Sequence, residues 1–219
     1  MMRLLVLIVF LLGMSIPKGV HSTCYDRGVI ALTFDDGMSI RSLQIAAVLE
    51  EKQIKATFFV IGNILVKNTN MLSLKQIYER GHQIANHSWS HSHITRLTNQ
   101  QFDHEVLETQ NGLSLIDPNL KLYIRPPYGG INQDVYDRLS KLGYSVVLWN
   151  IDLRDWSGRS EERMMDSYEK VMSKSDPSTD SFILILHERE HTLNILPKII
   201  DISKSKGFRF VTIDNCLYF

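Results

Sequence analysis

The sequence has no excess of charge of either sign. Its 219 residues include 24 Lys+Arg and 24 Asp+Glu, so the formal net charge is zero. Binding to a nucleic-acid backbone rests on a basic excess that displaces counterions, and this chain offers none. An acidic disordered chain is equally excluded, because 44% of the residues are apolar and only 22% are charged. A chain of this length is expected to form one domain with a sizeable core.

The sequence also lacks an apolar run long enough to cross a bilayer comfortably, which takes about 20 residues. The run at 4–12 follows Arg3 and is ended by glycine and proline. A basic start, a short apolar stretch and small residues at Val20 and Ser22 predict a secretory signal peptide over 1–22, cut after Ser22. An uncleaved signal anchor is the alternative. Cleavage would leave a secreted or cell-wall protein with a net charge of −2 and no stable membrane insertion.

Cysteine is scarce, and the two present, Cys24 and Cys216, lie near opposite ends of the mature chain. In an oxidising compartment such a pair is expected to form a disulfide. That bond would tie the mature N-terminus to the C-terminus and constrain the unfolded chain. Two free buried thiols are the alternative.

Strand-like segments alternate with amphipathic helical segments along the mature chain, 23–219. The strands are expected at 29–34, 56–61, 83–86, 122–125, 144–149, 182–186 and 208–212, and the helices at 40–52, 74–80, from Thr98 onward, 135–142, 164–171 and 195–202. Repeated strand–helix units imply a parallel sheet with helices outside, either open or closed into a barrel. No internal repeat or appended module is visible.

Polar residues gather directly after the predicted strands. They are Asp35 and Asp36, His87 and His91, Arg125 to Tyr128, Asp152 to Trp156, and His187. In barrels of this type the chemistry lies where strands end and loops begin. These residues are therefore expected on one rim of the fold.

Two histidines four residues apart, His87 and His91, can converge on one metal ion. One carboxylate with two imidazoles leaves positions open for water, as in catalytic metal sites. This donor set suits zinc or another late divalent metal better than Mg²⁺ or Ca²⁺. Each pair alone has a simpler interpretation, since Asp-Asp-Gly is typical of turns and a histidine pair is typical of a solvated face.

Taken together, the rim residues resemble the motifs of a known family, the polysaccharide deacetylases of the NodB homology domain (carbohydrate esterase family four). The five motifs occur in order as Thr33–Gly37, His87–His91, Arg125–Tyr128, Asp152–Trp156 and Ile185–His187. The resemblance implies a distorted (β/α) barrel of about seven parallel strands. Two positions depart from the family pattern: Ile185 stands where leucine is usual, and Met38 where proline is common.

The resemblance also implies a role for each motif residue. Asp36, His87 and His91 would bind a divalent metal, zinc first and cobalt as the alternative. Asp35 would be the general base and His187 the general acid. Arg125 would hold Asp35, and Asp155 would orient His187. The backbone N–H of Tyr128 would stabilise the oxyanion, while Trp156 and Ile185 would wall the acetyl pocket.

Residues outside these roles are expected to be structural. Trp149 lies in a predicted strand and is expected in the core, and Asp152 is expected to support the site or only the fold. Four further histidines, His82, His93, His104 and His191, are expected to face solvent.

The resulting hypothesis is a secreted, metal-dependent hydrolase that removes N-acetyl groups from N-acetylglucosamine polymers and works as a monomer. Chitin or chitooligosaccharides are the first choice, because the terminal cysteine pair resembles that of fungal chitin deacetylases. Peptidoglycan or another acetylated polysaccharide is the second choice. A catalytically silent homologue that binds the cell wall is the alternative from a different class.

Overall fold

The computed structural model describes residues 19–218, so residues 1–18 of the predicted signal peptide lie outside the described range. Over these residues the chain forms a nine-stranded sheet. The strands are β1 (Val20–His21), β2 (Val29–Asp36), β3 (Thr57–Val60), β4 (Gln83–Asn86), β5 (Tyr123–Ile124), β6 (Ser145–Val147), β7 (Ile151–Asp152), β8 (Phe182–His187) and β9 (Arg209–Val211).

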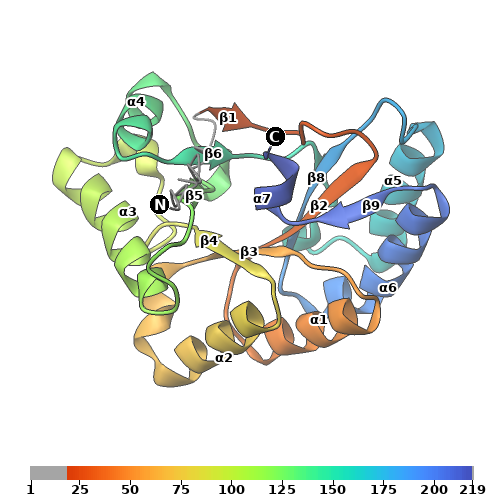
Figure 1. Ribbon diagram of the computed structural model, residues 1–219, viewed down its shortest axis with the longest axis horizontal. Helices are drawn as coiled ribbons and strands as arrows, with labels where there is room; N and C mark the ends of the chain where they lie inside the picture. Colours follow the sequence, from red (N-terminus) through yellow and green to blue (C-terminus); the bar gives the residue numbers. More distant parts are fainter. Residues whose placement is uncertain (1–18, 219) are drawn as a thin grey trace, which may run out of the picture.

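Every strand pairing in this sheet is parallel, in the order β1-β6-β5-β4-β3-β2-β8-β7, and β9 pairs with β2 off this path. The sheet curls, and the longer helices lie around its outside (Figure 1). This is the predicted distorted barrel, and the prediction of its fold class is confirmed. The central strand β2 is buried along almost its whole length, as expected for a strand covered on both faces.

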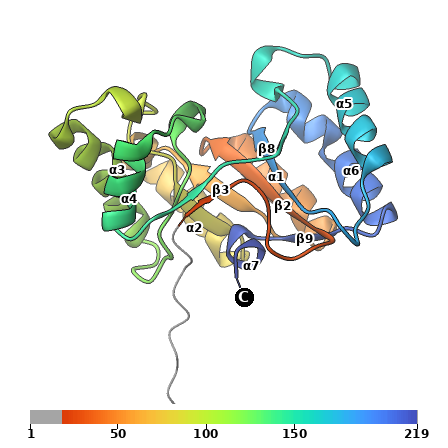
Figure 2. The ribbon, with the colours of Figure 1, turned by 90° about the horizontal axis from the view of Figure 1, so that it is seen from above.

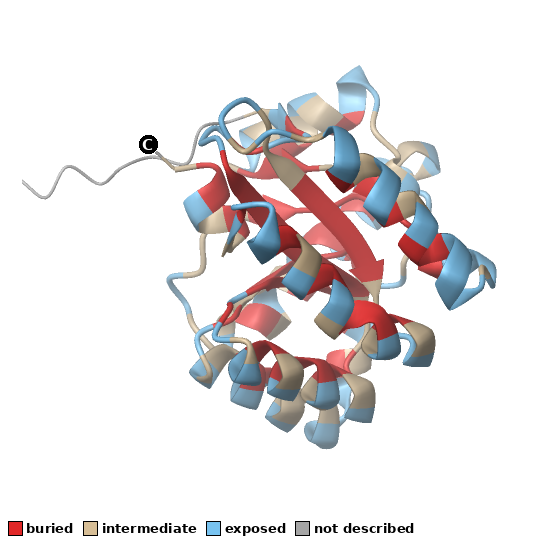
Figure 3. Cartoon of the chain, turned by 90° about the vertical axis from the view of Figure 1, so that its right-hand side faces the viewer, coloured by how far each residue is buried: buried red, intermediate tan, exposed pale blue. Residues whose placement is uncertain are grey.

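The helices are α1 (Ile40–Glu51), α2 (Asn68–Glu79), α3 (Asn99–Ser114), α4 (Gln133–Lys141), α5 (Glu161–Lys174), α6 (Glu190–Ser205) and α7 (Ile213–Cys216), with short 3₁₀ turns η1 (Gly62–Val66), η2 (Ile94–Arg96), η3 (Pro127–Gly129) and η4 (Asp155–Ser157). The pairs α3/α4, α1/α2 and α5/α6 occupy successive sectors around the sheet (Figures 1 and 2). Their inner faces are buried and their outer faces exposed (Figure 3). Thr98 caps α3 in a capping box with Gln101, as its sequence predicts.

Several element boundaries differ from those predicted, and the short strand β1 was not predicted. The strand expected at 144–149 ends at Val147, and a separate short strand, β7, follows it. Helix α2 begins at Asn68, six residues before the predicted start, because its first turn is polar and shows no apolar periodicity. Strand β1 has too few residues for a periodic signal.

Strand β1 lies within the predicted signal peptide, at its described end. The backbone N–H of Val146 donates to the carbonyl of Gly19 (2.9 Å), and that of Leu148 donates to the carbonyl of His21 (2.7 Å). A cut after Ser22 would remove this strand and leave the edge of β6 unpaired. Among the described residues, no helix is long and apolar enough to cross a membrane.

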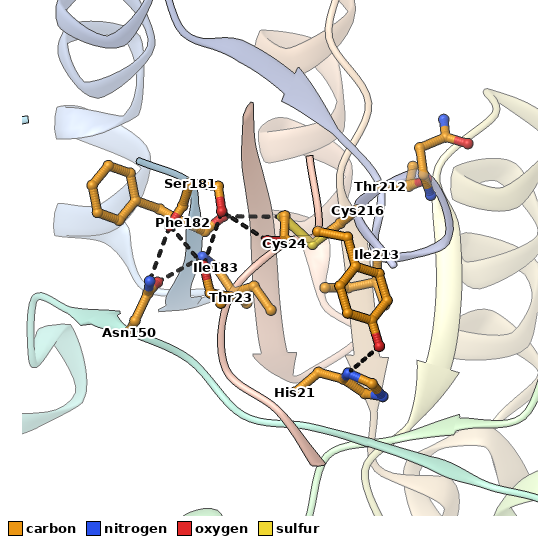
Figure 4. Close-up of a disulfide and its surroundings, with 12 residues drawn as sticks. His21, Thr23, Cys24, Asn150, Ser181, Phe182, Ile183, Thr212, Ile213 and Cys216 are labelled. Carbon is orange, nitrogen blue, oxygen red and sulfur yellow. Dashed lines mark hydrogen bonds between the residues drawn. A yellow bond between two sulfur atoms is a disulfide. The ribbon is translucent and has the colours of Figure 1, made fainter. Parts of the chain in front are cut away.

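Cys24 and Cys216 form a disulfide, with their Cα atoms 4.7 Å apart (Figure 4). The N–H of Tyr25 donates to the carbonyl of Cys216 (2.9 Å), so a backbone hydrogen bond accompanies the covalent one. On the other side, the Ser181 hydroxyl donates to the carbonyl of Cys24 (2.9 Å). The bond therefore fixes α7 and the segment before β2 against each other at the end of the barrel remote from the strand carboxyl ends.

His82 does not face solvent as expected, because it lies at 2% exposure behind α2. Its Nδ1 accepts a hydrogen bond from the N–H of Ala56 (3.2 Å), and its ring packs edge-on against Phe58. Burial, together with the nearby charges of Lys55 and Arg80, lowers the pKa of His82 to about 4.

We predict that replacing both cysteines, in C24S/C216S, lowers the free energy of unfolding by about 3–5 kcal/mol. The sequence separation of 192 residues makes the closed loop long, so losing the crosslink releases much chain entropy in the unfolded state. Equilibrium denaturation in urea measures the loss, and the wild-type protein under reducing conditions should show a similar one. A loss below about 1 kcal/mol would contradict the prediction.

We predict that His82 makes the fold less stable in acid. The pKa of His82 in the folded protein lies below the ordinary value of 6.5. The contribution of His82 to the free energy of unfolding is therefore complete above pH 6.5 and declines as the pH falls toward 4, by up to about 3 kcal/mol. In His82→Asn, whose side-chain oxygen can still accept from Ala56, this part of the pH dependence should disappear. His104→Asn is the same change at an exposed position and serves as the control. The prediction would be wrong if the free energy of unfolding changed equally with pH in the wild type and in H82N.

Candidate active site

The carboxyl ends of β2, β4, β5 and β8 meet at one edge of the sheet around a cavity of about 530 Å³. In the parallel register of β2 and β8, Asp35 lies beside His187. The residues that line the cavity are Asp35, Asp36, His87, His91, Tyr128, Trp149, Asp152, Trp156, Ile185, His187 and Arg189. The expectation that the motif residues share one rim therefore agrees with the structure.

Asp35 forms a buried ion pair with Arg125. The Arg125 Nη1 donates to Asp35 Oδ1 (2.6 Å) and to the hydroxyl of Thr33 (2.8 Å). The same guanidinium donates to the carbonyls of Val147 and Leu148, each at 3.2 Å. Both charged side chains have almost no exposed surface, so the charge of each must be compensated by the opposite charge of the other.

Asp36, His87 and His91 form a cluster whose candidate ligand atoms all lie within 4.8 Å of one another. Asp36 Oδ1 lies 3.6 Å from His87 Nε2 and 3.5 Å from His91 Nε2. This oxygen is buried and has no hydrogen-bond partner, which is costly unless a cation meets it. The opposite nitrogens of both rings are engaged, His87 Nδ1 with the carbonyl of Arg125 (2.7 Å) and His91 Nδ1 with the Tyr128 hydroxyl (3.2 Å). These contacts orient the Nε2 atoms toward Asp36, as second partners do for ligating histidines.

The surroundings favour the protonation states that a metal requires. Burial alone would raise the pKa of Asp36, but hydrogen bonding and charge from the histidines outweigh it and lower the pKa to about 2. Burial, assisted by the charge of His87, lowers the pKa of His91. A carboxylate and a neutral imidazole are the forms that bind divalent cations. The three residues thus fit a metal ion of the zinc type by donor chemistry.

His187 is held by Asp155, which precedes it by 32 residues in sequence. Asp155 Oδ1 lies 2.8 Å from His187 Nδ1, while its Oδ2 accepts from the backbone N–H of His187 (2.6 Å) and the hydroxyl of Thr192 (2.7 Å). Burial lowers the pKa of His187, but the hydrogen bond and charge of Asp155 outweigh burial and raise it overall. The imidazolium form is therefore favoured, with its Nε2 left for the cavity.

The loop that carries the two candidate histidine ligands is strained and supported from behind. Ser88 and His91 both have positive φ values, 64° and 61°, which non-glycine residues rarely adopt. Glu105 on α3, itself buried, accepts from the backbone N–H of Ser90 (2.8 Å) and from its hydroxyl. Glu105 therefore fixes the loop between the two ligands, a role that its position in an ordinary helical stretch did not reveal.

Tyr128, Trp156 and Ile185 all line the cavity. Tyr128 has φ 61°, and its hydroxyl contacts His91, a contact the sequence did not predict. Its ring also stacks on His93, with centroids 4.1 Å apart. Trp156 is half exposed, whereas Ile185 is buried. A stacked aromatic pair thus lies on one side of the cavity and an exposed tryptophan on another.

Three cavity residues were given no role by the family resemblance, although Asp152 was expected to support the site or only the fold. Trp149, expected in the core, is partly buried against it, but it lies just beyond β6 and also lines the cavity. Asp152 lines the cavity too, and its Oδ1 accepts from the N–H of Arg154 (2.7 Å). Arg189 places Nη2 3.8 Å from Asp36 Oδ2. Its position two residues after His187, beyond the end of a strand, is the signal that could have identified it.

The fold and the site together define a class of protein: parallel barrels that carry paired carboxylates and histidines at the carboxyl ends of their strands. The family model for polysaccharide deacetylases matches residues 22–147. The chain is 31% identical over 198 residues to a peptidoglycan-N-acetylglucosamine deacetylase of Bacillus cereus, a match covering 86% of this chain and 88% of that one. The protein therefore belongs to the polysaccharide deacetylase family.

Two further relatives differ in length and named substrate. The peptidoglycan-N-acetylglucosamine deacetylase PgdA of Listeria monocytogenes is 33% identical over 188 residues, which are 85% of this chain but only 38% of that protein. The chitin deacetylase of Colletotrichum lindemuthianum is 28% identical over 201 residues, 89% of this chain and 81% of that one. A solved structure of chitin deacetylase from that fungus superimposes with a TM-score of 0.83 at 27% identity, covering 90% of this chain and 91% of the other.

We predict that the effects of substituting Arg125 and Asp35 on the free energy of unfolding are strongly coupled. Arg125→Met leaves a buried carboxylate without its partner and should lower the free energy of unfolding by about 3–5 kcal/mol. The double variant D35N/R125M removes both charges and should lose at least about 1 kcal/mol less than the two single variants combined. Urea denaturation of the four proteins measures this cycle. Additive losses would contradict the buried ion pair.

Proposed function

We propose that this protein is a secreted, metal-dependent hydrolase that removes N-acetyl groups from N-acetylglucosamine polymers and releases acetate. The observation that carries the proposal is the placing of Asp35 and His187 beside the Asp36–His87–His91 cluster in one cavity. Amide hydrolysis needs an activated water, a home for the developing oxyanion and a proton for the leaving amine. Each requirement has a candidate group here.

Asp36, His87 and His91 would hold the metal, zinc first and cobalt as the alternative. When bound, the ion would act as a Lewis acid that polarises the amide carbonyl and makes water more acidic. The support for this site is the unpartnered Asp36 Oδ1 and the two imidazoles already turned toward it.

Asp35 would take the proton from the attacking water. Arg125 donates to one of its oxygens, Oδ1, and so holds the carboxylate in a fixed orientation. Its Oδ2 lies 3.7 Å from His87 Nε2, next to the metal cluster. The base is therefore oriented toward the place where the substrate carbonyl and water would meet.

His187 would donate a proton to the nitrogen of the leaving amine. Asp155 binds Nδ1, which leaves Nε2–H of the imidazolium as the donor. The proposed base and the proposed acid thus have different charged partners, Arg125 and Asp155. Asp155 would position His187 through these contacts.

The remaining groups would bind the substrate. The backbone N–H of Tyr128, at a residue with φ 61°, would donate to the oxyanion. Ile185 and Trp156 would enclose the acetyl methyl group, because both present apolar surface to the cavity. The exposed face of Trp156 is also suited to a sugar ring.

Chitin or chitooligosaccharides are our first choice of substrate, and peptidoglycan strands are the second. The named substrates of the relatives share the N-acetyl group of an N-acetylglucosamine unit. The chitin deacetylase of C. lindemuthianum and the peptidoglycan deacetylase of B. cereus each match this chain over most of both lengths, whereas the chain spans about two fifths of the Listeria protein. Chitin comes first because the terminal Cys24–Cys216 pair resembles that of fungal chitin deacetylases. We further propose that 1–22 is a signal peptide, that 23–219 is the deacetylase domain, and that the protein acts as a monomer.

We predict acetate release from chitohexaose by the Zn²⁺- or Co²⁺-loaded protein, lost on chelation and restored by metal. Asp35→Asn should lower the rate by at least about 100-fold, because the general base is removed. Asp166→Asn makes the same chemical change on the exposed face of α5 and should leave the rate unchanged. An acetate assay measures all three proteins, and circular dichroism checks that each is folded.

The same assay on peptidoglycan and acetylated xylan separates the alternatives. Release only from peptidoglycan would select the second substrate. Release only from xylan would redirect the activity to ester hydrolysis. No release from any N-acetylated glycan by metal-loaded protein would overturn the proposal and favour a silent wall-binding role.

A further inference from the structure

Arg189 is a cationic side chain beside the candidate metal ligands, and no motif of the family resemblance includes it. It lies at the carboxyl end of β8, two residues after His187, and it precedes the first residue of α6. It lines the cavity, and its guanidinium is half exposed. Its Nη2 lies 3.8 Å from Asp36 Oδ2.

The two carboxylates adjacent to Arg189 in sequence have other partners. Glu190 pairs with Arg41 on α1 (3.2 Å). Glu188 accepts a hydrogen bond from the hydroxyl of Ser42, also on α1. Asp36 is therefore the carboxylate that faces the Arg189 guanidinium across the cavity.

The two oxygens of Asp36 have different surroundings. Oδ1 is buried, lies near both imidazoles and has no hydrogen-bond partner, so it is the oxygen suited to a cation. Oδ2 faces Arg189. Because the positive charge of Arg189 lies beside Oδ2, a metal ion is expected to contact Asp36 through Oδ1 alone. The same charge repels any second cation nearby.

We propose that Arg189 is a positioning residue that weakens metal binding at Asp36, His87 and His91 while fixing which Asp36 oxygen is offered. The inference rests on the metal site of the proposed function. Two electrostatic effects act in the same direction. The apo protein loses part of the Arg189–Asp36 attraction when metal binds, and the bound ion is repelled by the guanidinium.

The size of the effect follows from the exposure of the pair. A half-exposed ion pair is weak, and water screens the repulsion from the guanidinium. We therefore expect Arg189→Gln to bind Zn²⁺ about three- to tenfold more tightly than wild type, where tenfold corresponds to about 1.4 kcal/mol. Arg189→Lys keeps the charge and should remain within twofold of wild type.

Competition with a chromogenic chelator measures these affinities. Zn²⁺, and in a second series Co²⁺, is titrated into a mixture of the chelator and the metal-free protein at constant pH. Arg41→Gln removes the same charge from the neighbouring Arg41–Glu190 pair, away from Asp36, and is the matched control expected within twofold of wild type. Tighter binding in R189Q alone supports the inference. Unchanged or weaker binding in R189Q, or equal tightening in R41Q, overturns it.

This readout does not depend on catalysis. If wild type binds metal and releases acetate but R189Q binds no more tightly, only the role of Arg189 fails. If wild type binds neither Zn²⁺ nor Co²⁺, both the metal site of the proposed function and the role of Arg189 fail. If the affinities change as expected but no glycan is deacetylated, the role of Arg189 holds and the proposed activity fails.

Discussion

Arg125 is a charged side chain with no exposed surface, and the geometry of the site depends on how that charge is compensated. Removing a guanidinium from water costs several kcal/mol unless its donors are satisfied. Here they reach Asp35 and Thr33 on the central strand and the carbonyls of Val147 and Leu148 at the end of β6. One side chain thus ties strands from two parts of the sheet together directly beneath the cavity.

This arrangement gives two neighbouring carboxylates different environments. Consecutive residues of a strand ordinarily point to opposite faces, so Asp35 and Asp36 would not share a cavity in a regular strand. Asp36 departs from strand geometry with φ 83°, and both side chains then line the same space. Asp35 is compensated by a permanent charge, Arg125, whereas Asp36 lies against two histidines and retains an unpartnered oxygen. The first environment suits a base, and the second suits a metal ligand.

Much of this site could be predicted from the sequence, because parallel strands bring their carboxyl ends to one edge. Asp35, His87, Arg125 and His187 follow strands that were recognised from their apolar residues, and all four reach the cavity or its floor. What the sequence could not give was the path of the chain beyond the strands. The turn from β6 to β7 takes Trp149 out of the expected strand and into the cavity wall.

Other features were missed because their signals are local and weak. Strand β1 has only two residues, too few for a periodic pattern. The buried position of His82 depends on packing against Phe58, and a single polar residue after a helix gives no sign of that contact. Arg189 was missed because no motif of the family resemblance includes it, although it follows a strand as the other site residues do. Only the fold shows that it lies near Asp36.

The supports of Asp35 and of His187 come from opposite sides of the Asp36–His87–His91 cluster. Arg125 reaches Asp35 from the β5 and β6 side of the sheet, while Asp155 reaches His187 from η4, with Thr192 of α6 behind it. Each charged group therefore has its own partner, and neither needs the other to remain in position. The parallel register of β2 and β8 then fixes the distance between them, because it places Asp35 opposite His187. Register and two separate ion pairs, rather than any one loop, hold Asp35 and His187, the proposed proton acceptor and donor, on a common cavity.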